Sequence, residues 1–187
     1  MSYACTTADP PWEEKGGGKI KRGADRHYPL LPVPDIIRVM LGHPKWDPAT
    51  DSHLWLWVTD NFLDVAMSVV MPALGFRFVR TFVWVKESNQ GNLQIGLGQY
   101  GRGAHELCLF GVRGHGRRLV QNKDVPSVCH APRTKHSRKP DKFYREHVER
   151  VSPGPRLEMF ARHSRGRGWH VMGNEVEDLP AAPGWTP

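Results

Sequence analysis

Short runs of β-branched and aromatic residues alternate along this chain with segments whose apolar residues repeat at helical spacing. The runs predict strands over residues 3–8, 53–59, 76–86, 106–112, 157–160 and 169–172. The helical spacing predicts a helix over 34–42 and another over 141–151. A third helix is predicted to begin after Asp60, which would cap it. Because strands alternate with helices, the sequence predicts an α/β domain with a largely parallel sheet.

Three long glycine- and charge-rich stretches interrupt this pattern, at about 13–30, 87–105 and 113–138. Loops of this length in a small domain are usually functional or disordered, so we expect three mobile loops. No internal repeat and no linker divides the sequence, and its 187 residues fit a single domain spanning 1–187.

The composition excludes several classes of protein. No apolar run approaches the ~20 residues that a membrane helix needs, and the first residues lack the pattern of a signal peptide. The three cysteines are too few and too scattered for a disulfide framework or a zinc ribbon. We therefore expect a cytoplasmic protein without a bound metal, in which Cys108, Trp55, Trp57 and Trp84 fill the core.

The formal net charge is +7, and it is distributed unevenly. Residues 113–170 carry 15 basic and 5 acidic side chains, whereas the remainder carries 11 basic and 14 acidic ones. This concentration favours binding to a polyanion such as nucleic acid over the alternative of a solvated basic face.

One glycine-rich segment matches a known cofactor pattern only in part. Gly96, Gly98 and Gly101 fit the dinucleotide-binding pattern GxGxxG. That pattern needs a strand before it and a helix after it, whereas here a predicted strand follows. We interpret the segment as a glycine-rich loop that moves over a ligand.

An acidic residue ends the first predicted strand. Asp9 is followed by the rigid pair Pro10 and Pro11 and then by the aromatic Trp12. Ligands bind at the carboxyl ends of the strands of an open α/β sheet, so this position suits a functional acid. An ordinary strand-to-loop turn, with Trp12 packed over the core, fits the position equally well.

The chain also carries an ordered set of motifs. Between Asp9 and Glu175 it contains, in order, DPPW, ADRHYPLL, HLWLWVTD, FVWVK, HELCLFGVRG, SRKPDKFY, ERVSPGPRLEMFAR and GWHVMGNE. Together these resemble the N6-adenine methyltransferase family named for the seventy-kilodalton subunit of the messenger-RNA methyltransferase. The resemblance implies transfer of a methyl group from S-adenosyl-L-methionine to the exocyclic amine of adenine. It also implies a Rossmann-like sheet in permuted order, with the catalytic strand first and the cofactor strands last.

Within this resemblance, DPPW is the catalytic segment. The adenine amine is a poor nucleophile because its lone pair is delocalised into the ring. Acceptors for its N–H groups therefore favour the transition state, in which positive charge grows on nitrogen. The Asp9 carboxylate and the Pro10 carbonyl would be these acceptors, with the two prolines, Pro10 and Pro11, fixing the backbone. Trp12 would stack on the target base once it is removed from its strand or helix.

For the cofactor, the resemblance points to Asp9, Lys139, Arg162, Asn174 and Glu175. Lys139 matches a lysine near the cofactor carboxylate, and Arg162 matches the arginine at the end of the first cofactor strand. Asn174 and Glu175 match the pair near the ribose hydroxyls. Taken alone, Lys139 could instead be a surface residue, and Arg162 could pair with Glu158.

Two further groups of residues would contact the nucleic acid. Arg26, His27 and Tyr28 belong to the loop after DPPW, which in the family closes over the target base; Tyr28 is a candidate stacking ring or else packs on the following proline. The predicted nucleic-acid patch consists of Arg102, Arg133, Lys135, His136 and Arg138, with His105 close to Arg102 in the sequence.

The chain departs from the family pattern in two places. A segment that contacts the cofactor adenine usually precedes the catalytic strand, whereas eight residues precede Asp9 here, so we expect that contact to be missing or replaced. His163 and Ser164 stand where some relatives have further cofactor contacts, but the spacing to Trp169 is one residue short. Without a visible RNA-binding module, the resemblance favours a bacterial or phage DNA adenine methyltransferase. The same reaction on RNA and a non-catalytic nucleic-acid-binding partner are the alternatives.

Overall fold

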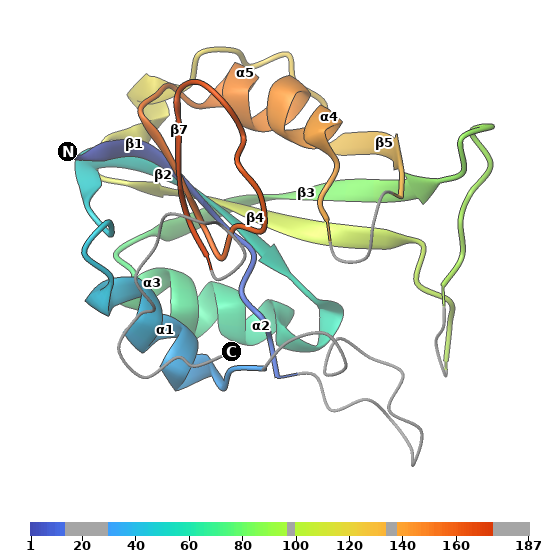
Figure 1. Cartoon of the computed structure of the whole chain (residues 1–187), viewed down its shortest axis with the longest axis horizontal. Coiled ribbons are helices and arrows are strands. Elements are labelled where there is room, and N and C mark those ends of the chain that lie inside the picture. The colour runs from blue at the N-terminus through green and yellow to red at the C-terminus, as the bar shows by residue number, and fades with distance from the viewer. Residues whose placement is uncertain (14–29, 97–99, 134–137, 174–187) are drawn as a thin grey trace.

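Seven strands of the described residues form one sheet, and the first strand lies inside this sheet instead of at its edge (Figure 1). The computed structural model of the chain describes residues 1–13, 30–96, 100–133 and 138–173. The order across the sheet is β5-β3-β4-β2-β1-β6-β7. The strands are β1 (Tyr3–Ala8), β2 (Pro48–Val58), β3 (Arg77–Glu87), β4 (His105–Arg113), β5 (Val128–Pro132), β6 (Arg156–Met159) and β7 (Trp169–Met172).

The sheet is mixed, with one reversed strand. β1 is parallel to β2 and β6, and the pairs β6–β7 and β3–β5 are also parallel. The sheet is thus largely parallel, as predicted, and β4 is the exception, since it runs antiparallel to both β2 and β3. The reason is the connection between β3 and β4, whose described residues form no crossover helix, and a parallel pair needs such a crossover. The first strand pairs with β6, which in turn pairs with the last strand, β7, and this confirms the permuted order.

The stretch 113–138, predicted to be one mobile loop, contains regular structure. β5 lies inside it and pairs with β3, and Gly116–Leu119 forms a 3-10 turn. Cys129 and Ala131 point inward from β5 and are buried, whereas the alternating residues Val128, His130 and Pro132 are exposed. Five residues that end in a proline give too short a pattern to stand out among charged neighbours, so the sequence analysis missed this strand.

Helices cover both faces of the sheet, with α1, α2 and α3 on one face and α4 and α5 on the other (Figure 1). α1 (Val33–Gly42) matches its prediction and has Pro34 in its first turn. Residues 60–73 form a 3-10 turn, then α2 (Leu63–Val65), a wider π turn and α3 (Met71–Ala73). The N-cap position of this segment is Thr59, not the predicted Asp60, and no side-chain hydrogen bond caps it.

The helix predicted over 141–151 is also interrupted by a π turn. It consists of α4 (Asp141–Phe143), a π turn (Tyr144–Val148) and α5 (Glu149–Val151). None of the helices within the described ranges is both long and apolar enough to cross a bilayer.

The two faces of the sheet have separate cores, and β2 contributes to both. Leu54 and Leu56 belong to the core under α1, α2 and α3, whereas Trp55 and Trp57 belong to the aromatic core under α4 and α5. Successive side chains of a strand point to opposite faces, which explains this division. Trp55, Trp57, Trp84 and Cys108 are all buried, as predicted.

The glycine-rich segment before β4 is not a dinucleotide-binding turn. The backbone N–H of Gly96 donates to the carbonyl of Gly103 at 2.7 Å, so the two sides of the segment lie together and lead directly into β4. Gly98 lies outside the described residues. The strand-turn-helix order of a true GxGxxG motif is therefore absent from the described part of this connection.

Four parallel strands, β1, β2, β6 and β7, end at the same edge of the sheet. Two backbone features shape this edge. Phe160, directly after β6, has φ +60°, a conformation that is uncommon for residues other than glycine. Gly173, directly after β7, approaches Ala161 so closely that a Cβ atom would collide with the Ala161 backbone. The loop after β6 and the end of β7 are thus held against each other.

Candidate active site

A row of four charged side chains begins at Asp9, directly after β1. The Nζ of Lys139 donates to Oδ2 of Asp9 at 2.8 Å and lies 3.0 Å from Oε2 of Glu106. Oε1 of Glu106 in turn lies 2.9 Å from the Nζ of Lys86. Only 10% of the Lys139 side chain is exposed, and its ammonium group lies 5.3 Å from the centroid of the Trp57 ring. Acids and bases from four separate segments therefore alternate at the sheet edge.

Glu106 reaches this site because β4 is reversed. The beginning of β4, not its end, lies beside the end of β2, since Leu107 pairs with Val58. Glu106 was not predicted, because an acid at the beginning of a strand reaches this edge only when that strand is reversed. The signal that could have found it is an acid at the start of the predicted strand ELCLFGV.

The charges at this site are set by burial and by the two lysines. Burial raises the pKa of Asp9, and Glu106 adds to this rise, against the opposing effect of Lys139 and Arg162. For Glu106, the effect of burial is outweighed by Lys139 and Lys86, which lower its pKa to about 2. Burial alone would lower the pKa of Lys139, but Asp9 and Glu106 raise it. Lys139 is therefore a permanent cation, Glu106 is a permanent carboxylate, and Asp9 is the group best able to take up a proton.

The two prolines form a tight turn after Asp9. The backbone N–H of Trp12 donates to the carbonyl of Pro10 at 2.9 Å, and that of Leu31 donates to the carbonyl of Pro11 at 2.7 Å. A carbonyl oxygen has two lone pairs, so the Pro10 carbonyl retains one for a second donor. The predicted role of Pro10 as an acceptor is compatible with this geometry.

Trp12 is a core residue in this structure. Its Nε1 donates to the carbonyl of Trp57 at 2.9 Å, its ring stacks on Phe62 with centroids 5.4 Å apart, and only 4% of the residue is exposed. This placement contradicts the predicted stacking of Trp12 on a target base, because the indole presents no open face. The alternative of a tryptophan packed over the core is the arrangement observed.

Two of the predicted cofactor residues lie close to Asp9. Lys139 contacts it directly, and Arg162, which follows β6, is near enough to lower the pKa of Asp9. Asn174 and Glu175 lie outside the described residues, but Gly173 directly precedes them. The backbone N–H of Ala161 donates to the carbonyl of Met172 at 2.8 Å, so the segment leading to Asn174 starts beside the one that carries Arg162.

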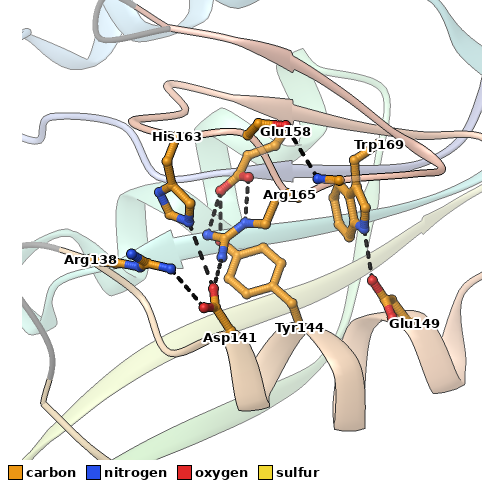
Figure 2. A network of polar contacts seen from close by, with 10 residues as sticks. Arg138, Asp141, Tyr144, Glu149, Glu158, His163, Arg165 and Trp169 are labelled. Carbon is orange, nitrogen blue, oxygen red and sulfur yellow. Dashed lines mark hydrogen bonds and ion pairs between the residues drawn. The ribbon is translucent and has the colours of Figure 1, made fainter.

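Glu158 on β6 is held by Arg165, a residue that the sequence analysis did not select (Figure 2). The guanidinium group of Arg165 also donates to Asp141, the first residue of α4, at 2.7 Å. We call Arg165, Glu158, Asp141 and Tyr144 the Arg165 cluster. No periodicity or motif distinguishes Arg165 in a segment rich in glycine and arginine, so its partners could not be inferred from the sequence.

His163 and Ser164 occupy the loop between β6 and β7. Nε2 of His163 lies 3.7 Å from Oδ1 of Asp141, and the Ser164 hydroxyl oxygen accepts a hydrogen bond from the Gly166 N–H at 3.3 Å. Burial lowers the pKa of His163, as does Arg165. Their contacts are thus with the loop itself and with α4.

The predicted nucleic-acid contacts are described only in part. Arg102 and Arg133 are exposed, and Arg138 forms a 2.7 Å ion pair with Asp141. The other members of these groups lie outside the described residues; they are Lys135, His136, Arg26, His27 and Tyr28. Within the described ranges, no group of three or more metal-ligating side chains is arranged to hold a metal ion.

The sheet order and the acid at the end of β1 agree with the resemblance found in the sequence. A family model, MT-A70, matches residues 3–175, which is nearly the whole chain. The match includes all four residues of the charged row. It also includes every predicted cofactor residue, among them Asn174 and Glu175. The chain therefore belongs to the MT-A70 family of S-adenosylmethionine-dependent adenine N6-methyltransferases.

Proposed function

We propose that this protein methylates the N6 amine of adenine in DNA and that Asp9 is its catalytic acceptor. The observation that carries this proposal is the Asp9–Lys139–Glu106 arrangement, which places a carboxyl group of raised pKa at the edge where an open α/β sheet binds its ligands. The basic segment 113–170 supports a polyanionic substrate. The choice of DNA over RNA follows the family resemblance, and the experiment below decides it.

The residues at this edge fit the methyl donor. Lys139 and Arg162 are cations that suit its carboxylate, and the Asp9 carboxylate suits its positively charged sulfonium group. When bound, the donor supplies an electrophilic methyl carbon, which the amine nitrogen takes up as the carbon–sulfur bond breaks. The chain's own contribution is to hold the two reactants in line, which supplies much of the rate in such transfers.

Asp9 and Pro10 act on the amine. Each oxygen of a carboxylate has two acceptor positions, so Asp9 can accept an amine N–H while Lys139 donates to Oδ2. The Pro10 carbonyl can accept the second N–H. These fixed acceptors stabilise the positive charge that grows on nitrogen, and the raised pKa of Asp9 suits it to receive the proton that leaves.

Replacement of Asp9 tests this role. Asp9→Asn keeps the shape of the side chain but removes its charge, so methyl transfer should fall by roughly 100- to 1,000-fold, as when one stabilising group is removed from an active site. Binding of S-adenosylmethionine, measured by calorimetry, should weaken much less than methyl transfer does, because Lys139 and Arg162 remain for the cofactor carboxylate. Asp64→Asn, a change of an exposed acid on α2, is the matched control and should retain full activity. Activity retained in Asp9→Asn would refute the assignment.

A comparison of DNA and RNA of the same sequence distinguishes the two possible substrates. Incorporation of tritiated methyl groups is compared for DNA and RNA of the same sequence, and digestion to nucleosides identifies the methylated base. N6-methyladenine in the DNA alone supports the proposal, whereas preferential labelling of the RNA assigns the same chemistry to RNA. Without methylation of either polymer, and without binding of S-adenosylmethionine, the chain would be a non-catalytic binding partner.

A further inference from the structure

Arg165 lies in the loop between β6 and β7, and its guanidinium group lies between Glu158 and Asp141 (Figure 2). Only 6% of its side chain is exposed. Its Nε and one terminal nitrogen donate to the two oxygens of Glu158 at 2.6 and 2.9 Å, and the other terminal nitrogen donates to Asp141 at 2.7 Å. Each of the three guanidinium nitrogens thus donates one hydrogen bond, an arrangement that the single ammonium group of a lysine could not reproduce.

Tyr144 completes the cluster. Its ring lies against the guanidinium group of Arg165, 3.4 Å from ring centroid to the central carbon, and its hydroxyl donates to Glu158 at 2.9 Å. Asp141 also accepts from Arg138 at 2.7 Å. Two acids and two arginines therefore balance each other, with Glu158 and Arg165 at 6% side-chain exposure each.

The cluster connects the two segments that carry the cofactor candidates. Lys139 lies two residues before Asp141, and Arg162 lies three residues before Arg165. The bond between Arg165 and Asp141 joins these segments, and the paired bonds to Glu158 fix both to β6. Through Lys139, the same segment reaches Asp9.

We propose that Arg165 is a positioning residue that holds the Lys139 segment and the Arg162 loop in the relative placement required to bind the methyl donor. This inference rests on the proposed function. Arg165 itself makes its contacts with the protein and acts on the ligand through the two segments. The donor site is accordingly assembled before the ligand arrives, which reduces the ordering cost of binding.

Arg165→Met tests the proposal, because methionine keeps the length and apolar character of the side chain and removes the fork. The dissociation constant of S-adenosylmethionine, measured by calorimetry on the folded fraction, should rise by roughly tenfold, because segments that Arg165 no longer holds must be ordered when the donor binds. Hydrogen exchange should accelerate in 138–143 and in 160–168. kcat at saturating donor should change less than kcat/KM for the donor, and Arg165→Lys should restore binding only in part.

Arg156 provides the matched control. It lies on β6, the strand that carries Glu158, where it donates to the carbonyls of Ser152 and Glu149 at 2.8 and 3.3 Å and faces the Trp169 ring. Arg156→Met should lower Tm but leave the dissociation constant of the folded protein unchanged. A merely structural role for Arg165 would give the same result as this control.

A double variant covers the case in which Arg165→Met does not fold. Glu158→Gln with Arg165→Met removes the opposite charges together, so no unpaired Glu158 charge remains buried. If either folded variant binds S-adenosylmethionine as tightly as the wild type, with both segments equally protected, the positioning role is overturned. If the wild type itself does not bind S-adenosylmethionine, the proposed function fails instead.

Discussion

A single ammonium group sets the state of two carboxyl groups at this site. Lys139 bonds to Asp9 and Glu106 together, and the two acids interact with each other through their charges. Glu106 raises the pKa of Asp9, so loss of the Glu106 charge has a defined effect on Asp9. The reactivity of one acid thus depends on the charge of the other, and neither can be understood alone.

The pH dependence of catalysis should report this coupling. If methyl transfer needs Asp9 in its charged form, kcat rises with pH through the pKa of Asp9, which lies above the ordinary value of 3.8. Glu106→Gln removes a charge that raises this pKa, so the rising part of the profile should move to lower pH. Glu146→Gln changes an exposed acid in the π turn between α4 and α5, and it should leave the profile unchanged. A profile of Glu106→Gln that is unshifted or moves upward would contradict the coupling.

Individual site residues differed in how far the sequence could reveal them. Asp9 was found because an acid, two prolines and an aromatic residue follow a recognisable strand. Glu106 was missed because the reversal of β4 depends on pairing between distant strands, which no local pattern encodes. Trp12 was assigned to a base, yet its hydrogen bond to Trp57 and its contact with Phe62 are tertiary contacts.

At the scale of elements, strong local patterns predicted the structure well. The bounds of β1 and β7 agree with the prediction, since each is a short apolar run with a clear end. β2 begins earlier than predicted because its first residue, Pro48, gains its place by pairing with Tyr3 of β1. β5 exists because the edge of β3 offers it a partner. β5 and the beginning of β2 form because another strand lies beside them, and the local sequence does not reveal such pairing.

The close contact between the end of β7 and the loop after β6 can be tested by adding a side-chain carbon at Gly173. A Cβ atom at Gly173 would collide with the backbone of Ala161, which cannot move aside as a flexible side chain could. Gly173→Ala should therefore lower the free energy of unfolding by about 1–3 kcal/mol, the usual cost of overpacking, in urea denaturation. Gly42→Ala is the control, because no atom lies within 4 Å of the added carbon and the residue lies at the end of α1. Equal stability of the two variants would exclude the close approach.

At the scale of the whole molecule, the uneven charge becomes a prediction about salt. If the basic segment 113–170 binds phosphates, the affinity for DNA should fall steeply as the salt concentration rises. The slope of the logarithm of the binding constant against the logarithm of the salt concentration measures the number of phosphates neutralised. Arg133→Glu combined with Lys135→Glu should weaken binding and flatten that slope. Arg77→Glu combined with Arg80→Glu, an equal reversal of two charges at exposed positions on β3, should change it little. Identical slopes for the wild type and the double variant would remove this segment from the binding surface.

The place of β1 between β2 and β6 has a consequence for biosynthesis. Thr6 pairs with Leu157, so about 150 residues must leave the ribosome before the first strand meets its second neighbour. At translation speeds of about 5–20 residues per second, this takes roughly 10–30 s, during which one side of β1 has no partner. The strand that ends in the catalytic acid is thus enclosed late, and the nascent chain gains its activity only when its last elements have emerged.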